Sequence, residues 1–297
     1  MRICKSSVFG LCLAAITAVD LNAQPFVDIL SVNYQYHLPT EYKESIHDSE
    51  RNLYIYSADV LLPVSIRKGN YLLAGGQYAH FNFGFRNGTR ESETFNVAEF
   101  RFGTLYQWKN EKDKTLVLLL PKWSGQGKVL KSSNFQTGGV VLHTHRISSS
   151  LAVKAGLYYN REFFGHFFMP LAGIDWEINE TLWLYGTLPG NLQLHKVLDP
   201  AFAVSLSYLS PSGSLLFEND SDYVRIGKSF PPYAILSIDA HLKLTGPLTF
   251  KGSIGHSIWR SYAAYDTDKV QDAEGPYVDY TDGVILKASM IARVFTQ

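Results

Sequence analysis

The chain has 297 residues, with 27 basic and 27 acidic side chains, 46% hydrophobic residues and 14% aromatic residues. This composition excludes an intrinsically disordered chain, because charge is scarce and aromatic residues are abundant. The zero formal net charge argues against the basic surface of a nucleic-acid-binding protein, so we expect no nucleic-acid partner. Neutrality also fits poorly with a freely soluble protein, because net charge favours solubility.

The N-terminal segment has the layout of a secretory signal peptide. Arg2 and Lys5 give a positive start, and the apolar residues 8–19 that follow are too few to span a bilayer as a helix. Ala23 is the small residue expected before a cleavage point. We therefore expect residues 1–23 to be removed and residues 24–297 to form one domain.

Both cysteines of the chain, Cys4 and Cys12, belong to this leader. The mature protein would therefore have no disulfide and no thiolate chemistry. A lipoprotein and an uncleaved N-terminal anchor are the alternatives. Leu11 is too large for the residue before a lipidated cysteine, and the short apolar stretch disfavours an anchor.

The rest of the chain alternates between apolar and polar residues with period two, as strands with unlike faces do. The clearest segments are 57–66, 96–108, 172–178, 236–244 and 286–294. A soluble β-sandwich also alternates, but four of these five segments (57–66, 96–108, 236–244 and 286–294) have nine or more residues, whereas globular strands usually have roughly 5–6. A tilted transmembrane strand needs about 9–11 residues, which these four segments provide.

Short and long connections between these segments follow one another along most of the chain. The short ones are 67–70, 109–114, 148–150, 179–180 and 245–247, and the long ones are 37–52, 86–94, 125–134, 162–168, 210–232 and 263–282. Outer-membrane barrels have short periplasmic turns, longer external loops and an even number of strands. The sequence therefore predicts an all-β fold, a closed antiparallel transmembrane β-barrel of about 12 strands (range roughly 10–14), with both termini on the periplasmic side. The segments 192–197, 202–209 and 223–228 leave the count open, because each could be a strand or a loop edge.

Tryptophan residues lie near both kinds of connection. Trp108, Trp176 and Trp183 flank short turns, and Trp123 and Trp259 lie near long loops. Because amphipathic rings favour the boundary between hydrocarbon and headgroups, this placement predicts two interfacial girdles. The alternative is the ordinary preference of aromatic residues for strands.

Residues 170–176 (PLAGIDW) and 182–191 (LWLYGTLPGN), with the leader and the alternating last segment, resemble a family of outer-membrane β-barrel proteins of unknown function from Gram-negative bacteria. The resemblance implies a barrel in the outer membrane after export through the inner membrane, with outer-membrane lipid and the barrel-assembly machinery as partners. It implies no activity. The chain departs from the terminal aromatic residue common in such barrels, because Phe295 is followed by Thr296 and Gln297.

Two groups of residues contain side chains that could bind a metal ion, but neither group has the spacing of a known metal site. His143 and His145 stand two residues apart, as a pair of ligands on one strand face would, but zinc needs further ligands and none is near in sequence. Histidines that line a polar lumen are the favoured interpretation. The stretch 266–282 is acidic, but its spacing matches no ordered calcium loop. Its carboxylates are Asp266, Asp268, Asp272, Glu274, Asp279 and Asp282. We predict no cofactor and no metal site.

Two histidine–serine pairs keep an outer-membrane lipid hydrolase as an alternative. His47 and Ser49 lie in a polar loop, and His256 with Ser257 has no neighbouring acidic or amide partner. Activation of a serine needs a base and a group that orients it. We predict no catalytic residue, and the sequence leaves open whether the protein is an enzyme, with a protein that has no enzymatic activity as the favoured interpretation.

Charged residues share the polar face of the predicted strands, and we expect them to line the lumen. They are Asp59, Glu99, Arg101, Lys154, Asp175, Glu177, Asp239, His241, Lys243, Lys287 and Arg293. Their mixed signs favour pairing across strands in a narrow interior over an open pore. Residues 163–168, with four phenylalanines, could plug this lumen, although a rim girdle is favoured.

The predicted function is passive transport or binding of a small molecule or ion through a polar lumen. The alternatives are a hydrolase and a closed structural or interaction barrel.

Overall fold

A computed structural model describes residues 26–40, 50–86, 92–127, 130–219, 222–227, 232–265 and 281–295. The predicted leader, the pair His47 and Ser49, residues 266–280 of the acidic stretch and residues 296–297 lie outside the described residues. Within the described ranges, no helix has the length and apolar character needed to cross a bilayer.

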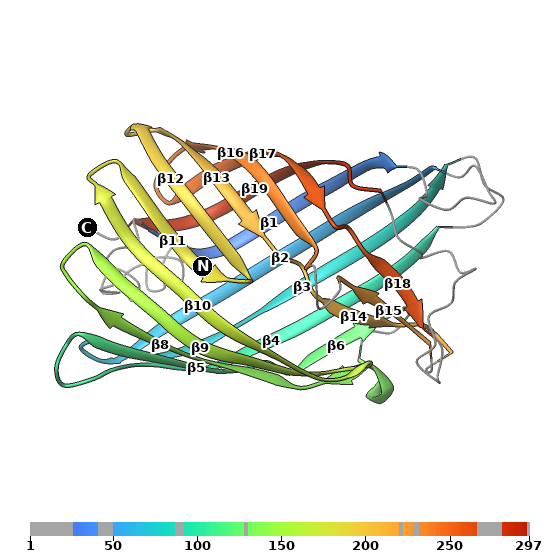
Figure 1. Cartoon of the computed structure of the whole chain (residues 1–297), viewed down its shortest axis with the longest axis horizontal. Coiled ribbons are helices and arrows are strands. Elements are labelled where there is room, and N and C mark those ends of the chain that lie inside the picture. The colour runs from blue at the N-terminus through green and yellow to red at the C-terminus, as the bar shows by residue number, and fades with distance from the viewer. Residues whose placement is uncertain are drawn as a thin grey trace, which may run out of the picture.

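Nineteen strand segments form one sheet that closes on itself (Figure 1). They are β1 (Phe26–Thr40), β2 (Glu50–Arg67), β3 (Asn70–Arg86), β4 (Glu93–Gln107), β5 (Asp113–Leu119), β6 (Lys122–Gly125), β7 (Phe135–Gln136), β8 (Gly138–Arg146), β9 (Leu151–Glu162), β10 (Gly165–Asn179), β11 (Leu182–Leu188), β12 (Asn191–Asp199), β13 (Phe202–Leu209), β14 (Gly213–Leu216), β15 (Tyr223–Ile226), β16 (Ala234–Lys243), β17 (Leu248–Ile258), β18 (Tyr262–Tyr265) and β19 (Val284–Phe295). A single 3-10 turn, η1 (Ser132–Asn134), is the one helical element of the described residues. β1 pairs antiparallel with β19 and with β2, which closes the barrel.

The wall contains 14 antiparallel strands. β5 and β6 both pair with β4 and form one wall strand, which is interrupted near Pro121, a residue with no amide hydrogen to donate. β7 and β8 form the next wall strand in the same way, and β14, β15 and β18 leave the wall. The closed antiparallel barrel is confirmed. Its strand number lies above the preferred value of about 12, because β12 and β13 are both full wall strands.

The two faces of the wall differ in polarity. On β16, Ile238 is 62% exposed on the outer face, whereas its neighbour Asp239 is 2% exposed on the inner face. Leu236 and Leu242 lie on the outer side with Ile238, and Ser237 and His241 lie on the inner side with Asp239. The period-two pattern of the sequence therefore separates an apolar outer surface from a polar interior.

The two ends of the barrel carry connections of different length (Figure 1). At one end, here the turn end, the strands are joined through residues 68–69, 108–112, 147–150, 180–181, 200–201 and 244–247. β1 begins and β19 ends there, at the left of Figure 1. The opposite loop end carries the connections 41–49, 87–92, 126–134, 210–233 and 259–283. One expectation is wrong: Phe163 and Phe164 form a two-residue turn between β9 and β10, not a long loop. Pro189 and Gly190 likewise join β11 to β12 by a two-residue turn.

The tryptophans divide between the two faces of the wall. Trp108 and Trp176 are exposed on the outer surface near the turn end, and Trp259 is exposed near the loop end. Trp183 instead faces inward, where its ring lies 6.3 Å from that of His195. Its assignment to a girdle is wrong, because its position on β11 has the parity of the inner face.

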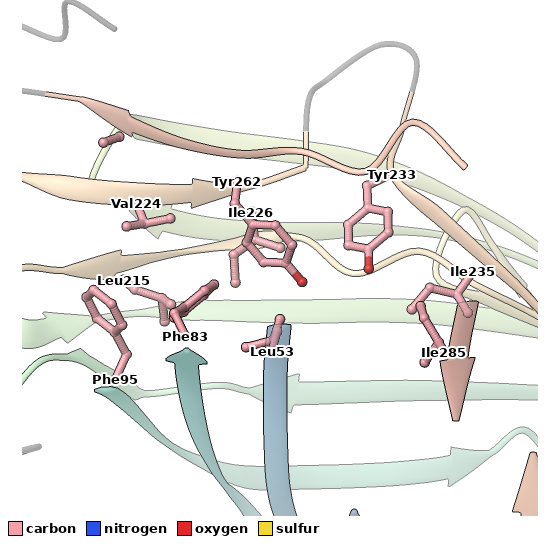
Figure 2. Packing of buried hydrophobic residues seen from close by; sticks show 11 residues of the cluster. Leu53, Phe83, Phe95, Leu215, Val224, Ile226, Tyr233, Ile235, Tyr262 and Ile285 are labelled. Carbon is pink, nitrogen blue, oxygen red and sulfur yellow. The ribbon is translucent and has the colours of Figure 1, made fainter. Parts of the chain in front are cut away.

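Three short strands form a separate layer inside the barrel at the loop end (Figure 1). β14 pairs with β15, and β15 pairs with β18; we call these three strands the inner sheet. Consecutive residues of the inner sheet are buried, as Ser214, Leu215 and Leu216 show, so both of its faces are covered. One face packs on the inward side chains of Leu53 and Phe83 (Figure 2).

The exposed apolar face of the wall predicts that the destabilisation caused by a charged residue depends on its depth in the bilayer. We expect Ile238→Arg, at mid-strand, to lower the free energy of unfolding in lipid vesicles by about 2–4 kcal/mol. Leu244→Arg, beyond the end of β16 at the turn end, is the matched control, with a cost of about 0–1 kcal/mol. Urea unfolding in vesicles measures both. Equal costs at the two positions would contradict a membrane-spanning wall.

Candidate functional site

The lumen is closed at the loop end by apolar packing. Leu215 and Tyr262 of the inner sheet lie against Leu53, Phe83 and Phe95, which point inward from three neighbouring wall strands (Figure 2). The ring of Phe83 makes edge-to-face contacts with Tyr262 at 5.5 Å and with Phe95 at 5.7 Å. Because these side chains are fully or almost fully buried, the packing excludes water from this end of the lumen.

The opposite face of the inner sheet is held by a buried polar network. The Ser214 hydroxyl donates to Glu162 Oε2 at 2.6 Å, and Lys122 Nζ donates to Glu162 Oε1 at 2.8 Å. The amide of Gln136 donates to Ser214 Oγ at 3.1 Å, and the Ser124 hydroxyl donates to the Ser214 carbonyl at 2.7 Å. Glu162 therefore connects the inner sheet to the wall, and its charge is compensated by Lys122.

The phenylalanine-rich segment divides between the inner sheet and the outer surface. The guanidinium carbon of Arg225 lies 4.3 Å above the ring of Phe164, and the ring of Phe163 lies 6.5 Å from that of Tyr223. These contacts place the turn against the inner sheet. Phe168, in contrast, is 61% exposed on the outer face of β10. The predicted aromatic girdle at the rim therefore fits Phe168 but not Phe163 and Phe164.

Charged side chains in the middle of the barrel pair across strands. Arg101 donates to Asp59 at 2.6 Å, to Glu99 at 2.9 Å and to Gln77 at 2.8 Å. The side chains of Arg101 and Asp59 are 21% and 30% exposed, so water reaches this cluster. Opposite charges on one face of neighbouring strands stabilise the sheet and fill part of the lumen.

A second ion pair, between Lys154 and Asp175, joins β9 to β10. The two side chains lie 2.6 Å apart and are almost completely buried. Lys154 and Asp175 therefore neutralise one another, and neither presents a free charge to the lumen.

The turn end of the lumen is closed by an arginine cluster. Arg293 donates to both carboxylate oxygens of Asp28, at 2.6 and 3.0 Å, and the ring of Phe26 lies 3.4 Å from its guanidinium carbon. The same guanidinium donates to His241 Nδ1 at 3.3 Å. This arrangement joins the first strand to the last and satisfies a charge that is almost fully buried.

A serine hydroxyl lies between two imidazoles beside this arginine. Ser205 Oγ is 2.7 Å from His195 Nδ1 and 2.9 Å from His241 Nε2. All three side chains are 2–3% exposed, and the group that orients His241 is a cation, not a carboxylate. The arrangement therefore lacks the oriented base and the access that a hydrolase needs.

His256 and Ser257, one of the two histidine–serine pairs noted in the sequence, do not form a base and a nucleophile. His256 is exposed on the outer face of β17, whereas Ser257 is fully buried on the inner face. The Ser257 hydroxyl accepts the amide of Gly283 at 2.8 Å. Adjacent residues of a strand point to opposite faces, which separates these two side chains.

A polar cavity of about 240 Å³ lies inside the wall between the two closed ends. Its lining includes Gln35, Gln193, Ser207, Ser237, Asp239, Lys251, Ser253 and Lys287, and the apolar side chains of Leu209, Ile235 and Ile285. Asp239 accepts the hydroxyls of Ser207 at 2.5 Å and Ser237 at 2.9 Å, and the amide of Gln193 at 3.4 Å. Ile235 and Ile285 also belong to the apolar cluster beneath the inner sheet, so the cavity lies directly below this closure.

The eleven charged residues of the polar face do not form one site. Asp59, Glu99 and Arg101 gather in one cluster, and Lys154 pairs with Asp175. Asp239 and Lys287 line the cavity, and His241 and Arg293 lie in the closure at the turn end. Glu177 and Lys243 lie close to that end of β10 and β16.

The sequence patterns did not predict several polar residues of the lumen. They are Asp28, Lys122, Glu162, His195 and Lys251. Lys251 shares the inner face of β17 with Thr249 and Ser253, two residues away on either side, so the period-two pattern could have revealed it. Lys122 and Glu162 lie at the ends of interrupted or turning strands, where alternation gives no signal.

The histidine pair lies on the outer surface, not in the lumen. His143 and His145 share the outer face of β8 with Val141, and the ring of His145 is 2.7 Å from Asp113 Oδ1. The corresponding distance for His143 is 3.3 Å. The expectation that these histidines line the lumen is wrong, because polarity alone does not define a face near a strand end. The described residues contain no group of three or more histidine, cysteine or acidic side chains arranged to hold a metal ion.

Comparisons with known proteins find similar solved structures but no matching sequence family or curated sequence. The sequence matches no protein-family profile and no curated protein. The structure is similar to an outer membrane channel from Pseudomonas putida F1 (TM-score 0.46, 9% identity, 93% of this chain and 98% of that chain). It is also similar to the translocator domain of autotransporter NalP from Neisseria meningitidis (TM-score 0.41, 8% identity, 96% and 94%) and to the Pseudomonas putida toluene transporter TodX (TM-score 0.36, 9% identity, 98% and 94%).

Glu162 gives a direct test of how the inner sheet is held. We expect Glu162→Ala to leave Lys122 as an unpaired buried charge, at a cost of about 3–5 kcal/mol, and to loosen the inner sheet. Hydrogen exchange of residues 213–216 and 223–226 should become faster. Glu180→Ala, in an exposed turn at the opposite end, is the control and should leave exchange unchanged. Unaltered exchange in the Glu162 variant would contradict the role of this network.

Proposed function

We propose that this protein is an outer-membrane barrel that binds a small polar molecule and lets it pass passively through its lumen. The observation that carries the proposal is the polar cavity beneath the inner sheet. The closure above the cavity is built from connections between wall strands, so it can move while the wall remains intact. The cavity and the water-accessible Arg101 cluster give a solute polar contacts inside the barrel.

The proposed location follows from the two faces of the wall. An apolar outer surface is suited to lipid, whereas an open aqueous environment would leave it exposed. In this proposal the turn end faces the periplasm, the loop end faces outward, and the barrel-assembly machinery inserts the chain after cleavage of residues 1–23. Outer-membrane lipid is then the partner of the whole outer surface.

Conductance in planar bilayers tests whether the inner sheet closes a passage. The variant replaces residues 211–232 with a short glycine–serine linker, which removes β14 and β15 and retains every wall strand. We expect small and infrequent channel events in the native protein and larger, persistent conductance in the variant, because the apolar closure is lost.

The matched control replaces Pro189 and Gly190, the turn between β11 and β12 at the same end, with Asn-Gly. We expect native conductance from it. If both the native protein and the linker variant are silent while both are inserted, the proposal fails and a closed structural barrel is supported.

A further inference from the structure

The cavity beneath the inner sheet contains more positive charge than its own residues neutralise. Lys251 and Lys287 reach it from β17 and β19, and Asp239 is its single carboxylate. Neither ammonium group has an ion-pair or hydrogen-bond partner among the described residues. Arg293, which lies toward the turn end, is already paired with Asp28.

Asp239 does not satisfy these two lysines. Its oxygens accept Ser207, Ser237 and Gln193. The carboxylate therefore already has three hydrogen-bond donors. It attracts Lys251 electrostatically, but one carboxylate cannot compensate two ammonium groups, so one positive charge of the cavity has no counter-charge. Lys251 and Asp239 are the charged groups that act on Lys287, so the lysines also repel one another. An anion that enters the cavity would relieve this repulsion and accept hydrogen bonds from both ammonium groups.

The cavity also has an apolar side. Ile235 and Ile285, which also pack in the apolar cluster with the inner sheet, line it together with Leu209. A volume of about 240 Å³ lies below that of sites for drug-sized ligands, which have roughly 300–1,000 Å³. The lining therefore fits a small molecule with an anionic group at one end and a short hydrocarbon part at the other.

We propose that this cavity is a binding site for a short-chain carboxylate, held by Lys251 and Lys287 with its hydrocarbon part toward Ile235 and Ile285. The proposal rests on the function proposed above and names the class of solute. The ligand's carboxylate oxygens accept hydrogen bonds from the two ammonium groups, and Gln35, whose amide nitrogen contacts His37 Nε2 at 2.5 Å, lies beside Lys287 on the neighbouring strand. No covalent step is involved.

Ligand binding to the full chain, folded in detergent micelles, tests the site. Butyrate is the probe, butyramide is its neutral counterpart of similar shape, and butylammonium is the cationic counterpart. We expect saturable butyrate binding by isothermal titration, at least about tenfold weaker binding of butyramide, and no binding of butylammonium, because charge-assisted hydrogen bonds to both lysines are lost. Equal affinity for butyrate and butyramide would overturn the proposal.

Variants locate the binding in the cavity. Lys251→Gln and Lys287→Gln should each weaken butyrate binding by about tenfold, whereas Lys68→Gln, in an exposed turn, should leave it unchanged. Asp239→Asn should strengthen binding, because it removes the only negative charge of the lining. Lys287→Arg retains the charge and should retain binding, so it separates loss of a ligand contact from loss of folding. Native affinity in both glutamine variants would overturn the proposal.

This assay is independent of passage through the membrane. If vesicles containing the protein admit neutral solutes and the micellar protein does not bind butyrate, the carboxylate site fails and the proposed passage stands. If butyrate binds and the linker variant conducts no current, the site stands and the proposed passage fails.

Discussion

The structure depends on the pairing of β1 with β19. An open sheet leaves one row of amide and carbonyl groups unpaired on each of its two edge strands, and hydrocarbon offers no partner for them. The pairing from Phe26 and Phe295 to His37 and Ile285 removes both edges. Once the sheet is closed, period-two alternation has only one outcome: one set of side chains faces outward, and the other set shares a common interior. Asp28 and Arg293 strengthen this seam at the turn end with a two-point hydrogen bond.

Closure by 14 strands creates an interior that side chains alone do not fill. The chain fills it in layers. Apolar packing of the inner sheet occupies the loop end, paired charges around Arg101 occupy the middle, and the cluster of Arg293 occupies the turn end. The inner sheet lies inside because Leu215, Val224 and Tyr262 gain contact with Phe83 and Phe95, whereas on the outside they would face solvent. What is left between these layers is the polar cavity, and the proposed solute site is a consequence of this incomplete filling.

The sequence predicted the wall well and the interior poorly. Alternation in segments such as 236–244 predicts both the strand and the face of each residue, because one face must be apolar. The inner sheet gives no such signal: its strands are only four residues long and are buried on both faces. His143 and His145 show the same limit near a strand end, where a polar residue is tolerated on either face. The pairs of Lys122 with Glu162 and of Ser205 with His241 join residues distant in sequence, and no local pattern reports such contacts.

The most direct test of this account is the environment of successive residues along β16 in lipid vesicles. The mature chain expected after cleavage has no cysteine, so single cysteines at positions 236–243 can each carry a spin label. Relaxation by oxygen, which partitions into hydrocarbon, and by a water-soluble nickel chelate reports the environment of each label. The account predicts that oxygen dominates at 236, 238, 240 and 242 and falls sharply at 237, 239 and 241. A uniform profile across these positions, or oxygen maxima at the odd-numbered ones, would contradict a closed barrel with an apolar outer surface and a polar lumen.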